Sequence, residues 1–223
     1  TALITNVAIQ KTTFKYEIPY MLLITAVILV MGMTGNEITF IEGVILWILF
    51  IAYLLYLYIL AKKGNDSGDE QSVKLYPVWK CLLFIVLGGV CVVIGSQFVV
   101  NGATTIARAC GMSERFIGLT IVAFGTSLPE LVTSVSAARK GNAGIAIGNI
   151  VGSNIFNILF VIGTVALICP VPFESRFVID TVVAILCGVL LWGGTIRHKE
   201  LRTPCGVVML LCYAAYFVYL AAM

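Results

Sequence analysis

One acidic residue is notable because it lies near the middle of an apolar stretch. Glu130 falls in the run 118–134, which reads GLTIVAFGTSLPELVTS. A charged side chain at the centre of a membrane span costs at least about 2.5–3.5 kcal/mol, so an ionisable residue there indicates a functional site. Thr126 and Ser127 precede Glu130 by four and three residues, which places all three on one face of a helix. Pro129 bends or breaks that helix and frees backbone oxygens beside the carboxylate.

An acid, two hydroxyls and freed backbone carbonyls make up a set of oxygen ligands. Hard cations such as Ca²⁺ prefer such a set, whereas softer metals prefer cysteine or histidine. The alternative is a structural acid, protonated or paired with a neighbour, beside an ordinary proline kink. The combination of oxygens on one face favours a cation site built on Glu130.

A second polar helix follows at 141–158, which reads GNAGIAIGNIVGSNIFNI. Ser153 and Asn157 are four residues apart and share a face, and Asn149 lies nearly on that face. Three glycines spaced four apart let another helix backbone come close: Gly144, Gly148 and Gly152. The polar side chains fit two interpretations, either hydrogen bonds between helices or neutral oxygen ligands that complement Glu130.

The elements that position these residues are expected to be membrane spans. Hydrophobic residues make up 60% of the chain and charged residues 11%, with a mean hydropathy of +1.04. Soluble domains have about 45–50% apolar and about 25% charged residues. This difference excludes an ordinary soluble enzyme, a nucleic-acid-binding protein and a disordered chain. We therefore expect a multi-pass protein of the cell (plasma or inner) membrane.

The expected fold class is all-α, a polytopic membrane helix bundle of about seven transmembrane helices. A crossing helix needs about 20 mostly apolar residues. Seven stretches satisfy this condition: 18–34, 41–61, 79–101, 117–138, 143–168, 178–196 and 204–223. The third is expected to bend or extend into 102–116, a short surface helix. The polar stretch 62–77 is typical of a flexible, solvated linker.

The distribution of positive charge predicts the orientation. With seven spans, eleven Lys and Arg residues fall on one side, which the positive-inside rule makes cytoplasmic: Lys11, Lys15, Lys62, Lys63, Lys74, Lys80, Arg139, Lys140, Arg197, Lys199 and Arg202. Three fall on the other side: Arg108, Arg115 and Arg176. The C-terminus is then expected outside.

Neither the cysteines nor the start of the chain indicates a secreted, disulfide-bonded protein. The seven cysteines include no CxxC pair, and most lie in apolar runs, where reduced cysteine behaves as a small hydrophobic residue. The chain opens on Thr1 without a basic segment before a cleavage site, so no secretory signal peptide is predicted. We expect this start to fall within a longer protein.

Two helix hairpins are related by a nearly constant shift along the chain. Ala2 matches Ala166, Gly32 falls near Gly193, and Gly43 falls near Gly206, which are shifts of 164, 161 and 163 residues. The second hairpin is preceded by three spans, residues 79–163, and the first by none. Copies with an odd number of spans insert in opposite directions, the arrangement of inverted-repeat transporters. The alternative is a native seven-helix protein whose similarities are accidental.

The two polar motifs, GTSLPELVTS followed by GNIVGSNIFN, resemble the second alpha repeat of the calcium/cation antiporter superfamily, and of its prokaryotic sodium/calcium exchangers in particular. Members have ten helices in two inverted halves, and the resemblance covers the whole chain as helices four to ten. It implies three parts: 1–62, the tail hairpin of the first repeat; 63–78, a cytoplasmic linker; and 79–223, the second repeat, with the ion site at 117–163.

The resemblance also implies roles for individual residues. Glu130 matches the acid that binds Ca²⁺ and serves Na⁺, while Thr126 and Ser127 match residues that supply backbone and hydroxyl oxygens. Ser153 matches a Na⁺-site serine. Asn157 matches a position that is Asp in some relatives and Asn in others, which leaves dependence on K⁺ or H⁺ open. The implied function is Na⁺-driven Ca²⁺ export by ligand exchange, with no enzymatic step, no cofactor and no nucleic acid.

One departure from the family pattern is expected to matter. The family site takes a second acid from the first alpha repeat, and this chain has no second Pro-Glu motif. Ca²⁺ binds about six to eight oxygens, so one carboxylate makes half a site. The chain would then need the missing first-repeat helices, or a partner chain that supplies them. The alternatives are an H⁺- or K⁺-coupled cation/Ca²⁺ exchanger and a non-transporting membrane half-module.

Overall fold

The computed structural model describes residue 2 and residues 7–64, 77–112, 114–141, 143–196 and 200–222. Most of the predicted linker 63–78 lies outside the described residues. The elements, with η for π-helical segments, are β1 (Val7–Ala8), η1 (Thr13–Glu17), α1 (Ile18–Gly35), β2 (Glu37–Ile38), α2 (Phe40–Gly64), α3 (Val78–Ala109), α4 (Glu114–Ile117), η2 (Gly118–Val122), α5 (Ala123–Thr126), α6 (Leu128–Arg139), α7 (Ala143–Phe156), η3 (Asn157–Ile162), α8 (Gly163–Ile168), β3 (Val171–Pro172), α9 (Ser175–Thr195), β4 (Glu200–Leu201) and α10 (Thr203–Ala222).

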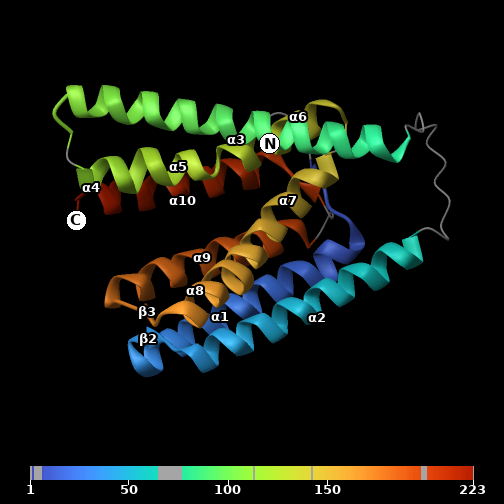
Figure 1. Ribbon diagram of the computed structural model, residues 1–223, viewed down its shortest axis with the longest axis horizontal. Coiled ribbons are helices and arrows are strands. Elements are labelled where there is room, and N and C mark those ends of the chain that lie inside the picture. The colour runs from blue at the N-terminus through green and yellow to red at the C-terminus, as the bar shows by residue number, and fades with distance from the viewer. Residues whose placement is uncertain are drawn as a thin grey trace.

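The helices form two groups that a single oblique helix connects. Figure 1 shows α3, α4, α5 and α10 on one side and α1, α2, α8 and α9 on the other. Helix α7 runs between the groups. It contacts α6 at one end and continues through η3 into α8 at the other. The all-helical fold class predicted from the sequence is confirmed.

Most of the predicted spans correspond to long apolar helices of this multi-pass membrane protein. Five helices in the described part of the chain are long and apolar enough to cross a membrane: Thr13–Gly35, Phe40–Lys63, Val78–Ala109, Gly144–Ile168 and Ser175–Thr195. A bent pair, Thr120–Thr126 with Leu128–Arg139, makes a sixth if it counts as one span. The predicted total of seven is not confirmed, because the described residues contain five such helices, or six with the bent pair.

The predicted extension of the third helix beyond residue 101 is confirmed. Helix α3 continues without a break to Ala109, so the short surface helix predicted over 102–116 is the end of α3 followed by the single turn α4. Arg108 donates to Glu114 from Nε at 2.6 Å and from Nη2 at 2.9 Å, which fixes the corner between the two helices. The hydrogen bond from Arg108 lowers the pKa of the Glu114 carboxyl.

Local signals mark the turn between α1 and α2. Asn36 adopts a left-handed conformation with φ of 56° directly after Gly35, a common way to end a helix. Glu42 Oε2 accepts hydrogen bonds from the Thr39 backbone N–H at 2.7 Å and from its hydroxyl at 2.9 Å. The bond from the backbone N–H is half of a capping box and helps to start α2.

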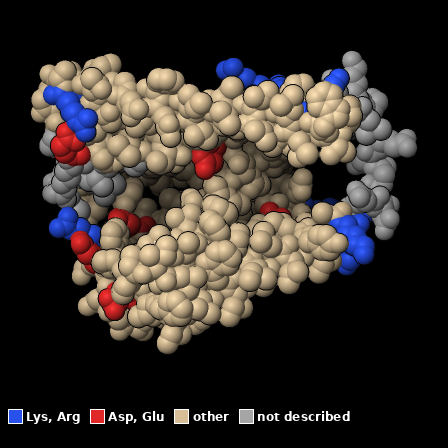
Figure 2. All heavy atoms as spheres, in the orientation of Figure 1, with Lys and Arg blue, Asp and Glu red and all other residues tan. Residues whose placement is uncertain are grey.

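The buried core lies between α1, α2, α7, η3 and α9. Its fully buried side chains are branched aliphatic residues: Ile18, Ile24, Leu46, Ile147, Val151, Ile155 and Leu159. By contrast, no residue in the most apolar stretch of α3 is buried. The space-filling view in Figure 2 shows broad areas without charged side chains over the helices. Such surfaces suit contact with lipid rather than water.

Two short antiparallel strand pairs repeat the same register. Strand β1 pairs with β4, with Val7 opposite Leu201, and β2 pairs with β3, with Val171 opposite Ile38. A shift of 164 residues carries Val7 onto Val171, and a shift of 163 carries Ile38 onto Leu201. Each pair therefore maps onto the other, which is the pattern of two intertwined copies of one hairpin.

A close glycine contact follows the same shift. A Cβ added to Gly43 would lie 2.9 Å from the Cβ of Ala166, and one added to Gly206 would lie 2.8 Å from the Cβ of Ala2. Gly43 and Gly206 are 163 residues apart, and Ala2 and Ala166 are 164 apart. The π-helical segment η1 accounts for the one-residue difference, because its wider turn accommodates an extra residue that α9 lacks.

Helices α1 and α9 also bury equivalent positions. At a shift of 163 residues their buried residues coincide: Thr25, Ile28 and Gly32 in α1 with Gly188, Leu191 and Thr195 in α9. The sequence match of Gly32 with Gly193 is therefore two residues out of register, since Gly193 is exposed and Thr195 is buried.

Candidate cation site

The predicted break in the helix lies at the residue before the Leu-Pro-Glu sequence. Ser127 has φ of −93° and ψ of 1°, and it ends α5 and begins α6. The segments on either side meet at an angle of 49°. Pro129 lies in the first turn of α6, where its missing N–H costs nothing to that helix. The Gly125 carbonyl thereby loses the donor that an unbroken α-helix would provide.

Close packing against α3 holds the break in place. A Cβ added to Gly125 would lie 2.0 Å from Cγ2 of Val100 on α3. Only a glycine allows the two helix backbones to come this close. The glycine in the Gly-Thr-Ser sequence thus has a packing reason independent of any ion.

A cavity of about 420 Å³ lies between α6 and α7 and contains all five residues predicted as ligands. Its lining consists mainly of oxygen-bearing side chains, with two aliphatic ones: Thr126, Ser127, Glu130, Leu131, Ser134, Ile150, Ser153, Asn154 and Asn157. The helix break brings the first three lining residues together, and the pairing of α6 with α7 brings the others opposite them.

The Glu130 carboxylate has an unsatisfied oxygen in this cavity. Its Oε2 is buried, and among the described residues no hydrogen-bond donor reaches it. A buried anionic oxygen without a partner is costly, so the position calls for a cation or a proton. Glu130 lies in the first turn of α6, so its carboxylate is near the positive end of the helix dipole. Glu130 is therefore a candidate ligand for a cation.

Asn149 forms hydrogen bonds between helices, which is one of the two interpretations given above for the polar residues of 141–158. Its Nδ2 donates to the Glu130 carbonyl at 3.2 Å, to Thr133 Oγ1 at 2.9 Å and to Ser134 Oγ at 3.1 Å. These contacts tie α7 to the turn that carries the carboxylate. Asn149 does not line the cavity, whereas Ser153 and Asn157 do.

The cavity wall on α7 is arranged around one backbone carbonyl. Ser153 Oγ donates to the Ile150 carbonyl at 3.2 Å, and Asn154 Nδ2 donates to the same oxygen at 2.9 Å. These bonds leave the hydroxyl lone pairs of Ser153 and the amide oxygen of Asn154 available as acceptors. Asn157 begins the π-helical segment η3, and π segments often occur at functional sites.

Sequence reasoning missed two polar lining residues, Ser134 and Asn154. Ser134 follows Glu130 by four residues, so helical spacing could have identified it. Asn154 is adjacent to Ser153 along the chain and faces the cavity only because α7 lies obliquely against α6, which sequence spacing does not indicate.

The oxygen-rich lining suits a hard cation better than a soft one. Among the described residues that line the cavity, Glu130 supplies the single carboxylate, and the described residues contain no group of three His, Cys, Asp or Glu that could hold a metal ion. Hydroxyl and amide oxygens provide the other donors. The site therefore offers one full charge and several neutral oxygens to an ion such as Na⁺ or Ca²⁺.

Residues 80–222 match the family model described as sodium/calcium exchanger protein. The chain is 32% identical over 212 residues to the inner membrane protein YrbG of Escherichia coli, an alignment that covers 86% of this chain and 62% of that protein. It is 38% identical over 142 residues to the sodium/calcium exchanger MaX1 of Methanosarcina acetivorans, covering 63% of this chain and 41% of that one. The chain thus spans roughly two fifths to two thirds of the length of these curated relatives.

The fold agrees with these sequence matches. A solved structure of the sodium-calcium exchanger NCX_Mj superposes with a TM-score of 0.77 and 31% sequence identity, covering 98% of this chain and 69% of that one. The family model matches more than half of the chain and includes both polar motifs of the cavity. The chain belongs to the sodium/calcium exchanger family of the calcium/cation antiporter superfamily.

Proposed function

We propose that this chain carries half of the ion site of a Na⁺/Ca²⁺ antiporter that exports Ca²⁺ as Na⁺ enters. The observation that carries the proposal is the buried Oε2 of Glu130, which has no donor among the described residues and belongs to an oxygen-lined cavity. Glu130 supplies the charge that offsets the cation. The remaining oxygens come from four residues: Thr126, Ser127, Ser153 and Asn157.

Transport at this site consists of ligand exchange. Protein oxygens replace the water around the ion, and the Glu130 carboxylate offsets its charge in a medium where water no longer screens it. Na⁺ and Ca²⁺ compete for the same carboxylate, so occupation by one favours release of the other. No covalent step is required, and the driving force is the ion gradient across the membrane.

A complete site requires a second set of oxygens. Ca²⁺ binds about six to eight oxygens, and a single carboxylate leaves it with an excess positive charge. We infer that three further helices, arranged like α3 to α8 and inverted with respect to them, supply a second acid opposite Glu130. The repeated strand register and the equivalent glycine contacts of Gly43 and Gly206 support such a two-fold arrangement.

The face of α10 is where one of these helices would dock. Helix α2 packs against η3 and α8, with Gly43 at the closest contact. The helix equivalent to α2 in the second hairpin is α10, in which Gly206 packs against Ala2. Further along α10, the side chains of Leu210, Leu211 and Tyr213 are exposed. A helix of the η3–α8 type that ends near Ala2 would cover them. The proposed parts 1–62, 63–78 and 79–223 follow from this arrangement.

The proposed location is the plasma or inner membrane. The long apolar helices make the chain a multi-pass membrane protein, and the relative YrbG is named an inner membrane protein. Export of Ca²⁺ from a cell requires this location, since the Na⁺ gradient lies across the same membrane.

Flux measurements test the half-site proposal. We expect the 223-residue chain, purified and reconstituted in liposomes, to show no Na⁺-driven uptake of radioactive Ca²⁺, and an assembly that contains the three additional helices to show it. Robust uptake by this chain alone would contradict the half-site argument. A homodimer could bring two acids together only if its copies inserted in opposite directions, and the charge bias of eleven to three argues against that.

The second candidate function is an exchanger that also uses K⁺ or H⁺. Asn157 lines the cavity without a charge, so η3 offers the coupling ion a neutral oxygen rather than a second acid. Ca²⁺ flux measured against separate Na⁺, K⁺ and H⁺ gradients distinguishes the coupling ions. A non-transporting half-module would show no flux with any of them, even in the complete assembly.

A further inference from the structure

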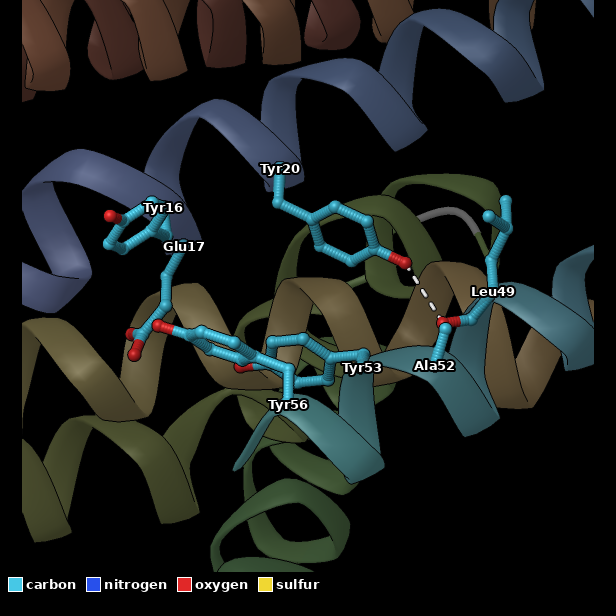
Figure 3. A pocket seen from close by; sticks show the side chains of 7 residues that line it. All are labelled: Tyr16, Glu17, Tyr20, Leu49, Ala52, Tyr53 and Tyr56. Atoms are coloured by element: carbon cyan, nitrogen blue, oxygen red, sulfur yellow. Dashed lines mark hydrogen bonds between the residues drawn. The ribbon is translucent and has the colours of Figure 1, made fainter. Parts of the chain in front are cut away.

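A second cavity lies between η1 with the first turn of α1 and the middle of α2, and the proposed antiport does not use it. Its volume is about 270 Å³, slightly below the usual lower end of about 300 Å³ for small-molecule pockets. Its wall consists of four tyrosines, two aliphatic residues and one acid, shown in Figure 3: Tyr16, Glu17, Tyr20, Leu49, Ala52, Tyr53 and Tyr56.

The acid in this cavity is buried and unpaired. Glu17 is 9% exposed, and within the described part of the chain no hydrogen bond or ion pair reaches its carboxylate. Lys15, two residues away, instead lies with its Nζ 5.3 Å from the centre of the Tyr16 ring. A mostly buried carboxylate without a partner in the protein favours a cation bound beside Glu17.

A phenolic oxygen beside the acid is also unsatisfied. Tyr56 Oη is buried, and none of the described residues gives it a hydrogen-bond partner. Figure 3 shows the Tyr56 hydroxyl directed toward the Glu17 carboxylate. The Tyr20 hydroxyl differs, because it donates to the Leu49 carbonyl at 2.9 Å. Two oxygens that can accept hydrogen bonds therefore converge on one end of the cavity.

Aromatic rings form the rest of the wall. The Tyr20 and Tyr53 rings stack with centroids 5.5 Å apart and planes 9° apart, and the Tyr53 and Tyr56 rings stack at 6.2 Å. Ring faces attract cations, and more so where water is excluded. Ca²⁺ takes carboxylate, carbonyl and water oxygens, whereas the side-chain oxygens of this lining are phenolic apart from the one carboxylate of Glu17. Tyrosines are common at membrane interfaces, but such a belt does not require a buried carboxylate.

We propose that this cavity binds a primary ammonium group carried on a short aliphatic chain. The ammonium would donate to the Glu17 carboxylate and to Tyr56 Oη, and its carbon chain would lie against the rings of Tyr20 and Tyr53. Such a group occurs in free alkylamines and in the ethanolamine headgroup of phospholipids. The cavity is placed to meet either one, since Glu17 lies in η1, at the start of the apolar span Thr13–Gly35.

The second hairpin provides an internal comparison. At the shift of 163 residues Glu17 corresponds to Asp180, and Tyr53 corresponds to Tyr216. There the acid is satisfied, because the Tyr216 hydroxyl donates to Asp180 Oδ1 at 2.5 Å. The same pair of residue types is thus closed in one hairpin and open in the other. Asp180 is accordingly a matched control for Glu17, as an acid at the equivalent position that already has a partner.

Calorimetric titration of n-butylammonium chloride into the natural protein in phosphatidylglycerol nanodiscs tests the proposal. We expect saturable binding, a loss of affinity of at least about tenfold in Glu17→Gln, and unchanged affinity in Asp180→Asn. The variant Tyr56→Phe keeps the ring and removes the oxygen, so its affinity for butylammonium should fall by a few fold. Tetramethylammonium cannot donate a hydrogen bond, so it should bind more weakly than butylammonium. Its affinity should be the same in Tyr56→Phe as in the wild type. Retention of the wild-type melting temperature identifies variants that fold.

The source of the amine is decided by repeating the titration with phosphatidylethanolamine in the nanodiscs. If phosphatidylethanolamine competes, it raises the apparent Kd for butylammonium, and Glu17→Gln abolishes this effect. Such a result identifies the lipid headgroup as the ligand. Unchanged binding assigns the site to a free amine. Two results overturn the proposal. The first is equal butylammonium affinity in the wild type and a folded Glu17→Gln variant. The second is no saturable binding of butylammonium together with no Glu17-dependent retention of phosphatidylethanolamine. The result is independent of whether the chain transports Ca²⁺.

Discussion

The Asn149 side chain donates a hydrogen bond to the backbone carbonyl of Glu130 across 3.2 Å. The same nitrogen lies 2.9 Å from Thr133 Oγ1 and 3.1 Å from Ser134 Oγ, so its two N–H groups serve three acceptors. One amide on α7 therefore fixes the first turns of α6, where the carboxylate of the cation site is located. The position of the charge depends on a residue that does not touch the cavity.

We expect Asn149→Ala to weaken cation binding by altering the position of Glu130 rather than by removing a ligand. Loss of the bridge should cost about 0.6–1.7 kcal/mol of stability, the range measured for hydrogen bonds between membrane helices. Thermal unfolding in detergent and Ca²⁺ titration of the complete assembly measure the two effects. Asn154→Ala serves as the stability control, since its amide bonds only within α7. Unchanged stability and affinity in Asn149→Ala would contradict the bridging role.

Glu130→Gln should abolish Ca²⁺-dependent binding and flux in the assembly that contains this chain. The change keeps the size of the side chain and removes the charge that offsets a divalent ion. Removing one member of a buried charge pair costs about 3–5 kcal/mol, so the affinity should fall by at least about a hundredfold. Asp180→Asn, a change to an acid outside the cavity, is the control. Near-normal Ca²⁺ affinity in Glu130→Gln would assign Glu130 a structural role.

The substitution Asn157→Asp should change monovalent selectivity more than Ca²⁺ binding. Asn157 lines the cavity opposite the helix break, where a new charge would alter the balance between Na⁺, K⁺ and H⁺. Ca²⁺ flux against each monovalent gradient measures the effect. If the dependence on all three ions stays as in the wild type, Asn157 has a packing role only.

Gly43→Ala tests the close contact between α2 and α8. The added Cβ would lie 2.9 Å from Ala166 Cβ and 3.1 Å from the Gly163 carbonyl oxygen, so the helices must separate. Overpacking of this kind typically costs about 1–3 kcal/mol. Gly88→Ala is the matched control, because nothing lies within 4 Å of its added Cβ and alanine favours a helix by up to about 1 kcal/mol. A melting temperature as high in Gly43→Ala as in Gly88→Ala would refute the tight contact.

Much of the fold was predictable from the sequence because the bilayer imposes a strong constraint. Backbone groups in lipid must be satisfied within a helix, so long apolar runs such as 41–61 correspond closely to helices such as α2. The break before Pro129 was predictable for a similar reason, because proline lacks an N–H and clashes with the preceding turn. Helix ends were less accurate, since composition alone does not mark where an apolar helix leaves the membrane.

The site was predicted in part for equally physical reasons. Glu130, Thr126 and Ser127 share a helical face, so spacing alone placed them together, and the cavity contains all three. Spacing could not separate Asn149 from Asn157. They lie two turns apart on nearly one face, yet Asn149 binds α6 and Asn157 lines the cavity. The oblique crossing of α6 and α7 makes that distinction.

The sequence by itself determined that this is a helical membrane protein with a carboxylate near the centre of an apolar span, because hydropathy and charge are properties of residues and need no neighbours. It also determined the family, through two ordered motifs. Only the tertiary structure decided which oxygens surround Glu130 and that Glu17 lies in the wall of a second cavity. The reason is that hydrogen bonds act over about 3 Å, a distance that helix crossings bring about between residues far apart in the chain.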